Sequence, residues 1–286
     1  MEDIRHLERN IKYRKIKSVV ILFLSFLTAV YGIFWLFWIL IDVFINGFQN
    51  ISLSLVLEDP KPPGVEGGGL KHAFIGHFLI TFIATLIGVP LGIAAGIFFT
   101  EYGRYSKFVE FMRTMTDSLV SLPSIIVGTA VYAILVKPVG HFFGLSGSVA
   151  LALLMLPVIA ITTAQILKLV PDSLREAAYA LGAYKWQVIK DVSLVAAKRG
   201  ILTGVILGIA RIAGETAPLL FTSFNNNFTT YNIFEPMASL TVTIFVYVMG
   251  PYEDWHRKAW ASAFILTFLT LIFFILSKYL IGRKKA

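Results

Sequence analysis

Long apolar runs separated by short polar segments dominate the hydrophobic pattern of this chain. A helix of about 20 apolar residues crosses a hydrocarbon core of about 30 Å, and several runs reach that length. We therefore predict an all-α polytopic membrane protein with six transmembrane helices. They are expected at residues 18–45, 72–100, 118–136, 146–167, 200–222 and 258–281.

Two segments between these runs do not fit a membrane-spanning helix. Residues 46–71 are rich in glycine and proline (DPKPPGVEGGG) and are expected to form an exposed, irregular extracytoplasmic loop. Residues 237–250 are apolar but number only 14, which is short for a span. We interpret them as a re-entrant or interfacial segment on the outer side, because a further span would place the basic carboxyl terminus outside.

The composition agrees with a membrane protein, since 57% of the 286 residues are hydrophobic and 15% are charged. Soluble domains average about 25% charged residues. The net charge is +8, and its distribution is informative: with the amino terminus inside, 18 of the 25 Lys and Arg residues fall in inner segments and five in outer segments. The remaining two, Arg113 and Arg211, lie at membrane depth. This asymmetry places both termini in the cytoplasm, with a basic amino-terminal segment at residues 1–17 and a tail at 283–286.

Several chemistries have no signature in the sequence. The chain has no cysteine, which excludes disulfides and thiolate metal sites. It has no G-x-x-x-x-G-K-[ST] phosphate loop and no H-E-x-x-H zinc motif, so any ATP that drives it must bind to another subunit. His72 and His77 lie five residues apart and therefore on different faces of a helix, which argues against a metal site. We expect no cofactor and no metal.

Three further charged residues are interpreted as interface residues. Arg113 and Asp117 lie four residues apart near the inner end of the third predicted span, where long side chains can reach the membrane surface. Asp42 closes the first apolar run.

The segment 171–194 (PDSLREAAYALGAYKWQVIKDVSL) is polar, basic and helix-prone, although it lies between two apolar runs. Pro171 suits the first turn of a helix, and Ser173 and Glu176 have the spacing of a capping box. Gly182 is expected to end this helix, and a second short helix is expected over Tyr184–Val192. We interpret the pair as a cytoplasmic hairpin that docks in a groove of a partner protein. The alternative is a helix lying on anionic lipid, for which Lys185, Lys190 and Lys198 would serve.

The fifth predicted span carries an intramembrane charged pair, Arg211 and Glu215. If the span begins at Gly200, Arg211 lies about 16 Å inside it. On a continuous helix, the pair and a stripe of glycines lie within about 80° of one another around the helix axis. The glycines permit close approach of another helix. The face comprises Gly200, Gly204, Gly208, Arg211, Glu215, Pro218 and Thr222. Pro218 leaves the Gly214 carbonyl without its helical partner, which weakens the helix beside the charges.

Two roles remain open for this pair. It can be a self-satisfied ion pair that fixes helix packing. Alternatively, Arg211 binds an oxyanion, because its planar fork of donors matches that geometry, and Glu215 keeps this binding weak enough for release.

Two stretches also resemble a known family. Glu176-Ala177-Ala178-x-x-x-Gly182 resembles the EAA motif of ABC-importer permeases. The string from Arg211 to Thr222 (RIAGETAPLLFT) resembles the signature of PstA-type permease subunits of phosphate ABC importers, as do GVPLGIAAGIFFTEYG at 88–103 and LREAAYALGA at 174–183. The resemblance covers roughly residues 72–282 and implies a MetI-like transmembrane domain there, with a type I ABC-importer permease fold.

The resemblance also implies roles for residues and partners. Arg211, Glu215 and Thr216 would serve substrate translocation. The residues implied for ATPase coupling are Arg175, Glu176, Ala177, Ala178 and Gly182. The partners would be a second permease (PstC-like), an ATPase dimer (PstB-like), an extracytoplasmic phosphate-binding protein (PstS-like) and membrane lipid, without nucleic acid.

The function expected from these features is that of a non-catalytic permease subunit of an ATP-driven phosphate importer in the cell membrane. The alternatives are a proton-coupled secondary anion transporter in which Glu215 titrates, and an ABC permease for another oxyanion such as sulfate or molybdate. A membrane enzyme is disfavoured because no nucleophile–base or metal set gathers on one face.

Overall fold

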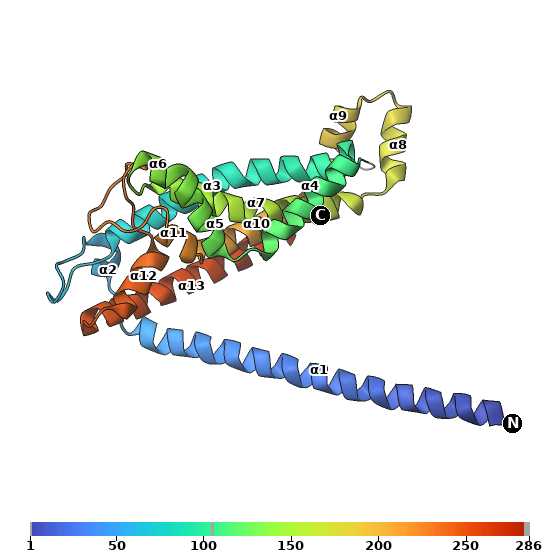
Figure 1. Ribbon diagram of the computed structural model, residues 1–286, viewed down its shortest axis with the longest axis horizontal. Helices are drawn as coiled ribbons and strands as arrows, with labels where there is room; N and C mark the ends of the chain where they lie inside the picture. The colour runs from blue at the N-terminus through green and yellow to red at the C-terminus, as the bar shows by residue number, and fades with distance from the viewer. Residues whose placement is uncertain (1, 104–105, 283–286) are drawn as a thin grey trace.

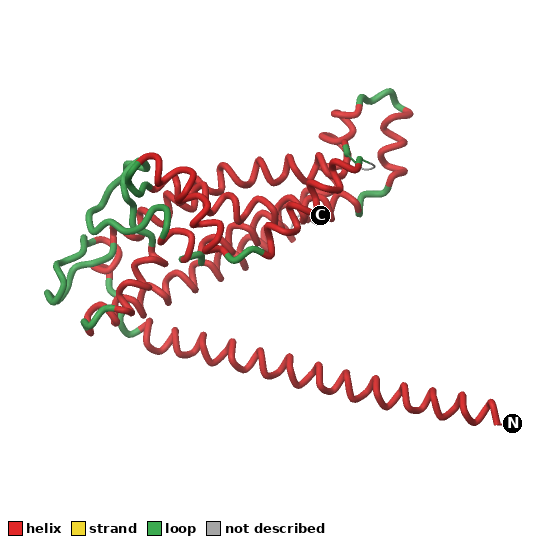
Figure 2. Tube along the Cα trace, viewed as in Figure 1, coloured by secondary structure: helices red, strands yellow, loops and turns green. Residues whose placement is uncertain are grey.

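The computed structural model describes residues 2–103 and 106–282 of the chain. These residues form helices joined by loops, with an isolated β-bridge between Pro60 and Gly68. Figures 1 and 2 show a bundle of long helices, one long helix that diverges from it, and a small helical projection. The prediction of an all-α fold is confirmed.

The helices differ widely in length along the chain. The α-helices are α1 (Glu2–Phe48), α2 (Leu53–Leu57), α3 (Lys71–Ile97), α4 (Lys107–Ser121), α5 (Ser124–Val131), α6 (Lys137–Val139), α7 (Gly144–Lys168), α8 (Asp172–Ala180), α9 (Lys185–Gln187), α10 (Leu194–Ala213), α11 (Ala217–Leu220), α12 (Leu240–Met249) and α13 (Glu253–Gly282). Three π-helical segments continue α-helices: η1 (Phe98–Tyr102), η2 (Tyr132–Val136) and η3 (Val188–Ser193).

Five stretches of the described residues are long and apolar enough to cross a membrane: 13–48, 71–102, 144–168, 185–213 and 253–279. A sixth is obtained if α4 and the helices that follow it count as one span, although they meet at an angle of 106°. The chain therefore has the five to six spans expected of the fold class.

The predicted third span, 118–136, is wrong as a single helix. α4 ends at Ser121 and α5 begins at Ser124. Pro123 has no N–H, and its ring disfavours a helical Leu122, which adopts an extended conformation (φ −70°, ψ 136°). The chain therefore turns sharply between the two helices.

The predicted fifth span, 200–222, is also wrong in both of its limits. The helix runs without a break from α9 through η3 to the end of α10 at Ala213. It stops at Gly214, and the short α11 begins only at Ala217. Because Pro218 cannot donate to the Gly214 carbonyl, the weak point expected there is a complete helix end.

Close packing of α7 between α3 and α10 forms the centre of the bundle (Figure 1). The contacts are made at two glycine stripes, Gly88, Gly92 and Gly96 on α3 and Gly200, Gly204 and Gly208 on α10. A Cβ added at Gly92 would meet Ile159 of α7 at 2.8 Å, and one at Gly204 would meet Thr162 at 2.5 Å. In a membrane, where burial of apolar surface drives helices together only weakly, such backbone proximity supplies the packing contacts.

α1 contacts the bundle near its carboxyl end and diverges from it elsewhere (Figure 1). Phe44 and Phe48 pack against Phe264 and Phe268 of α13, and Gly47 lies against Phe264 and the Trp260 carbonyl. α1 is longer than the predicted span 18–45. The extracytoplasmic loop expected at 46–71 therefore begins only after Phe48, and it includes the short helix α2.

The apolar segment 237–250 forms α12, which has ten residues and thus a length of about 15 Å. It is too short to span a bilayer, as expected, and it packs on α13 and α3. Ser239 caps its first turn by accepting the N–H of Val242.

The two ends of the bundle differ. α1 begins and α13 ends toward the end that carries α8 and α9, whereas α2, α6 and the start of α13 lie at the opposite end (Figure 1). The start of α1, the end of α13 and the 171–194 segment thus lie toward the same end (Figure 1).

Replacing Gly96 by leucine should destabilise the bundle. An added Cβ would meet the Thr163 Cβ at 2.5 Å and the Ala160 carbonyl oxygen at 2.7 Å. Overpacking of this kind costs about 1–3 kcal/mol. The matched control is Gly32→Leu on the diverging part of α1, where nothing lies within 4 Å of an added Cβ. Thermal unfolding in detergent should show a lower Tm for Gly96→Leu alone, and equal Tm values for the two variants would contradict the packing.

Candidate functional site

The segment 171–194 projects beyond the bundle as α8, a glycine turn and α9 (Figure 1). Gly182 adopts φ +83°, in the left-handed region that favours glycine. Its N–H donates to the Tyr179 carbonyl at 2.9 Å, and the Ala183 N–H donates to the Ala178 carbonyl at 3.1 Å. Gly182 therefore ends the helix as predicted.

Other expectations for this segment need correction. α8 begins at Asp172, so Pro171 precedes the helix, and no side-chain cap hydrogen bond forms there. Ser173 lies inside the first turn, which places it out of register for a capping box with Glu176. The second short helix expected over Tyr184–Val192 is the beginning of the long α9–η3–α10 helix.

The projecting residues present apolar and aromatic side chains to solvent. Leu181 is 90% exposed, Tyr184 72% and Trp186 57%. Glu176 and Ala177 are exposed as well, and Ala178 is half-buried. This pattern suits a surface that another protein covers.

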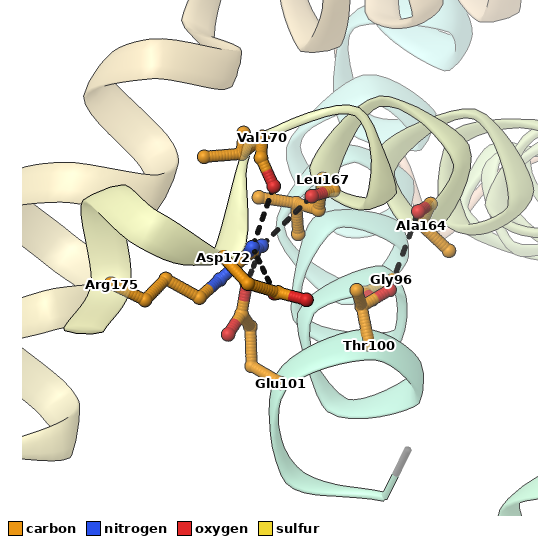
Figure 3. A network of polar contacts seen from close by, with 8 residues as sticks. All are labelled: Gly96, Thr100, Glu101, Ala164, Leu167, Val170, Asp172 and Arg175. Atoms are coloured by element: carbon orange, nitrogen blue, oxygen red, sulfur yellow. Dashed lines mark hydrogen bonds and ion pairs between the residues drawn. The ribbon is translucent and has the colours of Figure 1, made fainter.

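Arg175 differs from its neighbours because its side chain is only 11% exposed (Figure 3). Its Nη1 donates to the Val170 carbonyl at 2.7 Å and to Asp172 Oδ1 at 3.0 Å. Its Nη2 donates to Glu101 Oε1 and to the Leu167 carbonyl, both at 2.9 Å. The guanidinium thus connects α8 with the end of α7 and with η1.

The physical reason for this arrangement lies at the end of α7. The last carbonyls of a helix have no i+4 partner within the helix, and the planar guanidinium donates to one of them, that of Leu167, and to the Val170 carbonyl just after the helix. Glu101, whose side chain is 8% exposed, balances the charge. A cavity of about 180 Å³ adjoins the pair and is lined by Thr100, Glu101, Lys168, Asp172, Arg175, Tyr179 and Lys185.

Sequence reasoning missed Glu101. It lies 74 residues from Arg175, directly after the predicted span 72–100. The available signal was an acidic residue directly after an apolar run, and nothing in the sequence identified its partner.

Arg211 and Glu215 are brought together but only loosely. Arg211 lies in the last turn of α10, and Glu215 follows the helix end. Arg211 Nε and Glu215 Oε1 are 3.9 Å apart, which is an ion pair beyond hydrogen-bond distance. The Glu215 backbone carbonyl accepts a hydrogen bond from Thr241 of α12 at 2.9 Å.

The environment of Arg211 is mixed. Gly204, Gly208 and Ile212 pack on α7, whereas Arg211 remains 37% exposed at the edge of that contact. Its exposed side continues along α10 through Leu207 and Thr203. The glycines thus face protein as expected, whereas the charge lies at the border of a surface that the chain itself does not cover.

Thr216 comes directly after the ion pair and precedes α11, and it is half-buried. Its carbonyl accepts the N–H groups of Leu219 and Leu220 at 3.1 and 3.3 Å. Pro218 packs so tightly on α5 that a Cβ on Gly128 would meet it at 2.5 Å. The short helix α11, which follows the ion pair, is therefore packed closely on α5.

Arg113 and Asp117 lie apart from both groups. Arg113 donates to the Phe99 carbonyl at 3.3 Å, and both residues line a cavity of about 120 Å³ between α4 and α7. The structure gives Arg113 a contact with the end of α3, beyond the interface role predicted for the pair.

One continuous helix joins the second arm of the projecting segment to Arg211. Residues 185–213 run from the projecting segment to Arg211, a distance of about 40 Å. The second arm of the segment is thus joined to Arg211 without an intervening loop, whereas α8 is connected to that arm through the turn at Gly182.

Comparison with known proteins gives a consistent result. The family model described as "Binding-protein-dependent transport system inner membrane component" matches residues 88–285. The chain is 48% identical to the phosphate transport system permease protein PstA of Yersinia pestis, covering 96% of this chain and 92% of that protein. It is 45% identical to PstA of Haemophilus influenzae, covering 96% of both. The resemblance predicted from residues 88–103, 174–183 and 211–222 is confirmed.

Solved structures share the fold at low identity. A bacterial alginate ABC transporter in complex with its periplasmic protein includes a chain with a TM-score of 0.66 at 15% identity, covering 95% of this chain and 97% of that one. The inward-facing MetNI methionine ABC transporter gives 0.59 at 18% identity, covering 74% and 93%. The chain therefore belongs, with the PstA permeases, to the family of binding-protein-dependent transport system inner membrane components.

Proposed function

We propose that this chain is the membrane-spanning permease subunit of an ATP-driven phosphate importer. It forms half of the translocation path and couples that path to cytoplasmic ATPase subunits. The observation that carries this proposal is the continuous helix 185–213, which joins the exposed projecting segment to Arg211. The phosphate permeases among its relatives favour phosphate over sulfate or molybdate.

The charged pair provides an anion step in this proposal. With the carboxylate of Glu215 3.9 Å away, the guanidinium of Arg211 has donors free for the oxygens of a tetrahedral anion. Glu215 competes with the anion for the same charge, which keeps occupancy short. Thr216 adds a hydroxyl next to the pair.

The projecting segment provides the coupling step. Exposed Glu176, Ala177 and the turn at Gly182 would seat in a groove of the ATPase, with Ala178 behind them. Closure of the ATPases on ATP would push the segment, and α10 would carry that displacement to Arg211. ATP hydrolysis belongs to the partner subunits.

The assembly in this proposal has four kinds of component. Besides this chain, it contains a PstC-like permease, a PstB-like ATPase dimer and a PstS-like extracytoplasmic phosphate-binding protein. The unpartnered side of α10 at Leu207 and Arg211 would then face the second permease across the translocation path.

The arrangement in the membrane follows from the charge asymmetry of the chain. Residues 1–17 and 283–286 would lie in the cytoplasm, and 46–71 outside. The first helix at 18–45 anchors the permease domain, 72–282, which includes the coupling loop 171–194.

Replacing Arg211 by glutamine should reduce ATP-dependent phosphate uptake by the reconstituted complex about tenfold or more. The reason is that the anion loses at least one charge-assisted hydrogen bond, and a loss of about 1.4 kcal/mol corresponds to a factor of ten. Assembly of the complex should be unchanged, because the side chain is partly exposed. The matched control is Arg257→Gln, an exposed arginine at the start of α13. Uptake is measured with competing sulfate and molybdate.

Three results would contradict this proposal. Unchanged uptake by Arg211→Gln would remove the anion role. Stronger competition by sulfate than by unlabelled phosphate would change the substrate. Uptake by this chain alone on a pH gradient, without an ATPase, would favour a secondary transporter.

Replacing Gly182 by valine should weaken binding of the ATPase, because a β-branched residue is strained at φ +83° by about 1–3 kcal/mol. Gly182→Asn is the control, since asparagine tolerates this conformation and nothing lies within 4 Å of an added Cβ. The measurement is the amount of ATPase that co-purifies with each variant, together with uptake. Equal co-purification of both variants would exclude a role for the turn.

Single cysteines can test the orientation, because the chain has none of its own. Leu181→Cys, at a position 90% exposed on the projection, should react with a membrane-impermeant maleimide only when the cytoplasmic face is accessible. Phe228→Cys, at a position 80% exposed at the opposite end, should react in intact cells. The reverse labelling pattern would invert the proposed topology.

A further inference from the structure

We propose that Glu101 and Arg175 form a buried ion pair that transmits displacement of the coupling loop 171–194 to α3. This role rests on the proposed function, in which an ATPase moves the loop. It assigns a positioning role to Glu101, and it gives Arg175 an internal role in place of contact with the ATPase.

The burial of the two side chains separates Arg175 from the docking surface. Arg175 is 11% exposed and Glu101 8%, whereas Leu174, Glu176 and Ala177 around Arg175 are exposed. The arginine therefore points from α8 into the bundle, as Figure 3 shows. Its neighbours point outward and are available to a partner.

The contacts of Arg175 join three parts of the chain. Leu167 lies in the last turn of α7, Val170 follows just after that helix, and Asp172 begins α8. These bonds hold the loop to the helix that immediately precedes it. The bond to Glu101 at 2.9 Å is different, because it reaches a span 74 residues away.

Further contacts hold η1 to the same structures. Lys185, in the second arm of the loop, lies with its Nζ 4.6 Å from the centre of the Tyr102 ring. The Thr100 hydroxyl donates to the Gly96 carbonyl at 3.1 Å and lies 3.4 Å from the Ala164 carbonyl of α7. The end of α3 is therefore held by both arms of the coupling loop and by α7.

The local helix geometry is also unusual at this point. η1 is a π-helical segment of five residues that directly continues α3. Such segments shift the direction of side chains relative to an α-helix and are frequent at functional sites. Here the segment carries Glu101 and Tyr102, which contact Arg175 and Lys185 of the coupling loop.

A buried pair is suited to transmit force because separating its partners is unfavourable. Without Arg175, the buried Glu101 would lose its ion-pair partner, and without Glu101, Arg175 would retain the more exposed Asp172. Movement of the loop away from α3 would break the contact with Glu101. Since α3 packs on α7 through Gly88, Gly92 and Gly96, a displacement of η1 passes into the bundle.

The test uses the complete reconstituted complex and the variant Glu101→Gln, which keeps the shape of the side chain and removes its charge. The matched control is Glu110→Gln, an exposed carboxylate on α4. Two quantities are measured: phosphate uptake, and the number of ATP molecules hydrolysed per phosphate taken up. Hydrogen exchange of the α8 amides is followed in the same samples.

If the pair couples the loop to α3, Glu101→Gln should lower uptake by roughly tenfold while ATP hydrolysis continues, so that the ratio rises by a similar factor. Exchange in α8 should become faster, and Glu101→Asp should restore part of the uptake. The control should match the wild-type complex in every measurement.

Two outcomes would overturn the inference. If Glu101→Gln leaves the ratio of ATP hydrolysed to phosphate taken up unchanged, the pair does not couple the loop to α3, whether uptake is normal or falls together with hydrolysis. If Glu101→Gln does not assemble, Glu101→Asp decides instead. A wild-type ratio and wild-type hydrogen exchange of the α8 amides in that variant would also exclude the coupling role. Failure of the wild-type complex to import phosphate would instead contradict the proposed function.

Discussion

The packing of α7 between two glycine stripes is the contact on which the rest of the structure depends. Met155 and Ile159 of α7 each lie within reach of a glycine on α3 and of Gly208 on α10. Lipid chains are as apolar as leucine side chains, so van der Waals contact between backbones replaces the hydrophobic effect as the source of helix association. Because both stripes meet the same helix, they set the direction of α3 and α10 together. The ends of these two helices then determine where Glu101, the coupling loop and Arg211 lie.

The continuity of the helix 185–213 has a mechanical consequence. A loop between the coupling segment and the span would absorb displacement, whereas a hydrogen-bonded helix resists bending. The chain places its breaks at the two ends instead, at Gly182 with φ +83° and at Gly214. The helix therefore connects the projection to Arg211 without a loop, although it includes the π-helical segment η3, and its glycines lie in close contact with side chains of α7.

The sequence predicted those features that depend on local chemistry, and it failed where tertiary contacts decide. The lengths of the apolar runs, the end of α8 at Gly182 and the glycine stripe of α10 follow from hydropathy, backbone freedom and helical period. Proline residues show where prediction from sequence fails. Pro90 and Pro157 lie inside continuous helices, whereas the chain turns at Pro123. A membrane helix tolerates proline when neighbours compensate for the lost hydrogen bond, so a single sequence does not distinguish these cases. The pairing of Glu101 with Arg175 likewise depends on how α3, α7 and α8 assemble.

The helix end at Gly214 changes the meaning of the charged pair. On a continuous helix, Arg211 and Glu215 would be successive residues of one rigid face, and their separation would be constant. In the structure Arg211 belongs to the last turn of α10, whereas Glu215 lies beyond the helix end. The Glu215 N–H donates to the Ile212 carbonyl of α10 at 3.2 Å, and its carbonyl accepts a hydrogen bond from Thr241 of α12. Glu215 is therefore connected to both helices, and its carboxylate lies 3.9 Å from the Arg211 Nε. Under the proposed function, movement of α10 against α12 would change this distance and with it the number of arginine donors available to an anion. The helix end at Gly214 would then allow displacement of the segment 171–194 to alter affinity at Arg211.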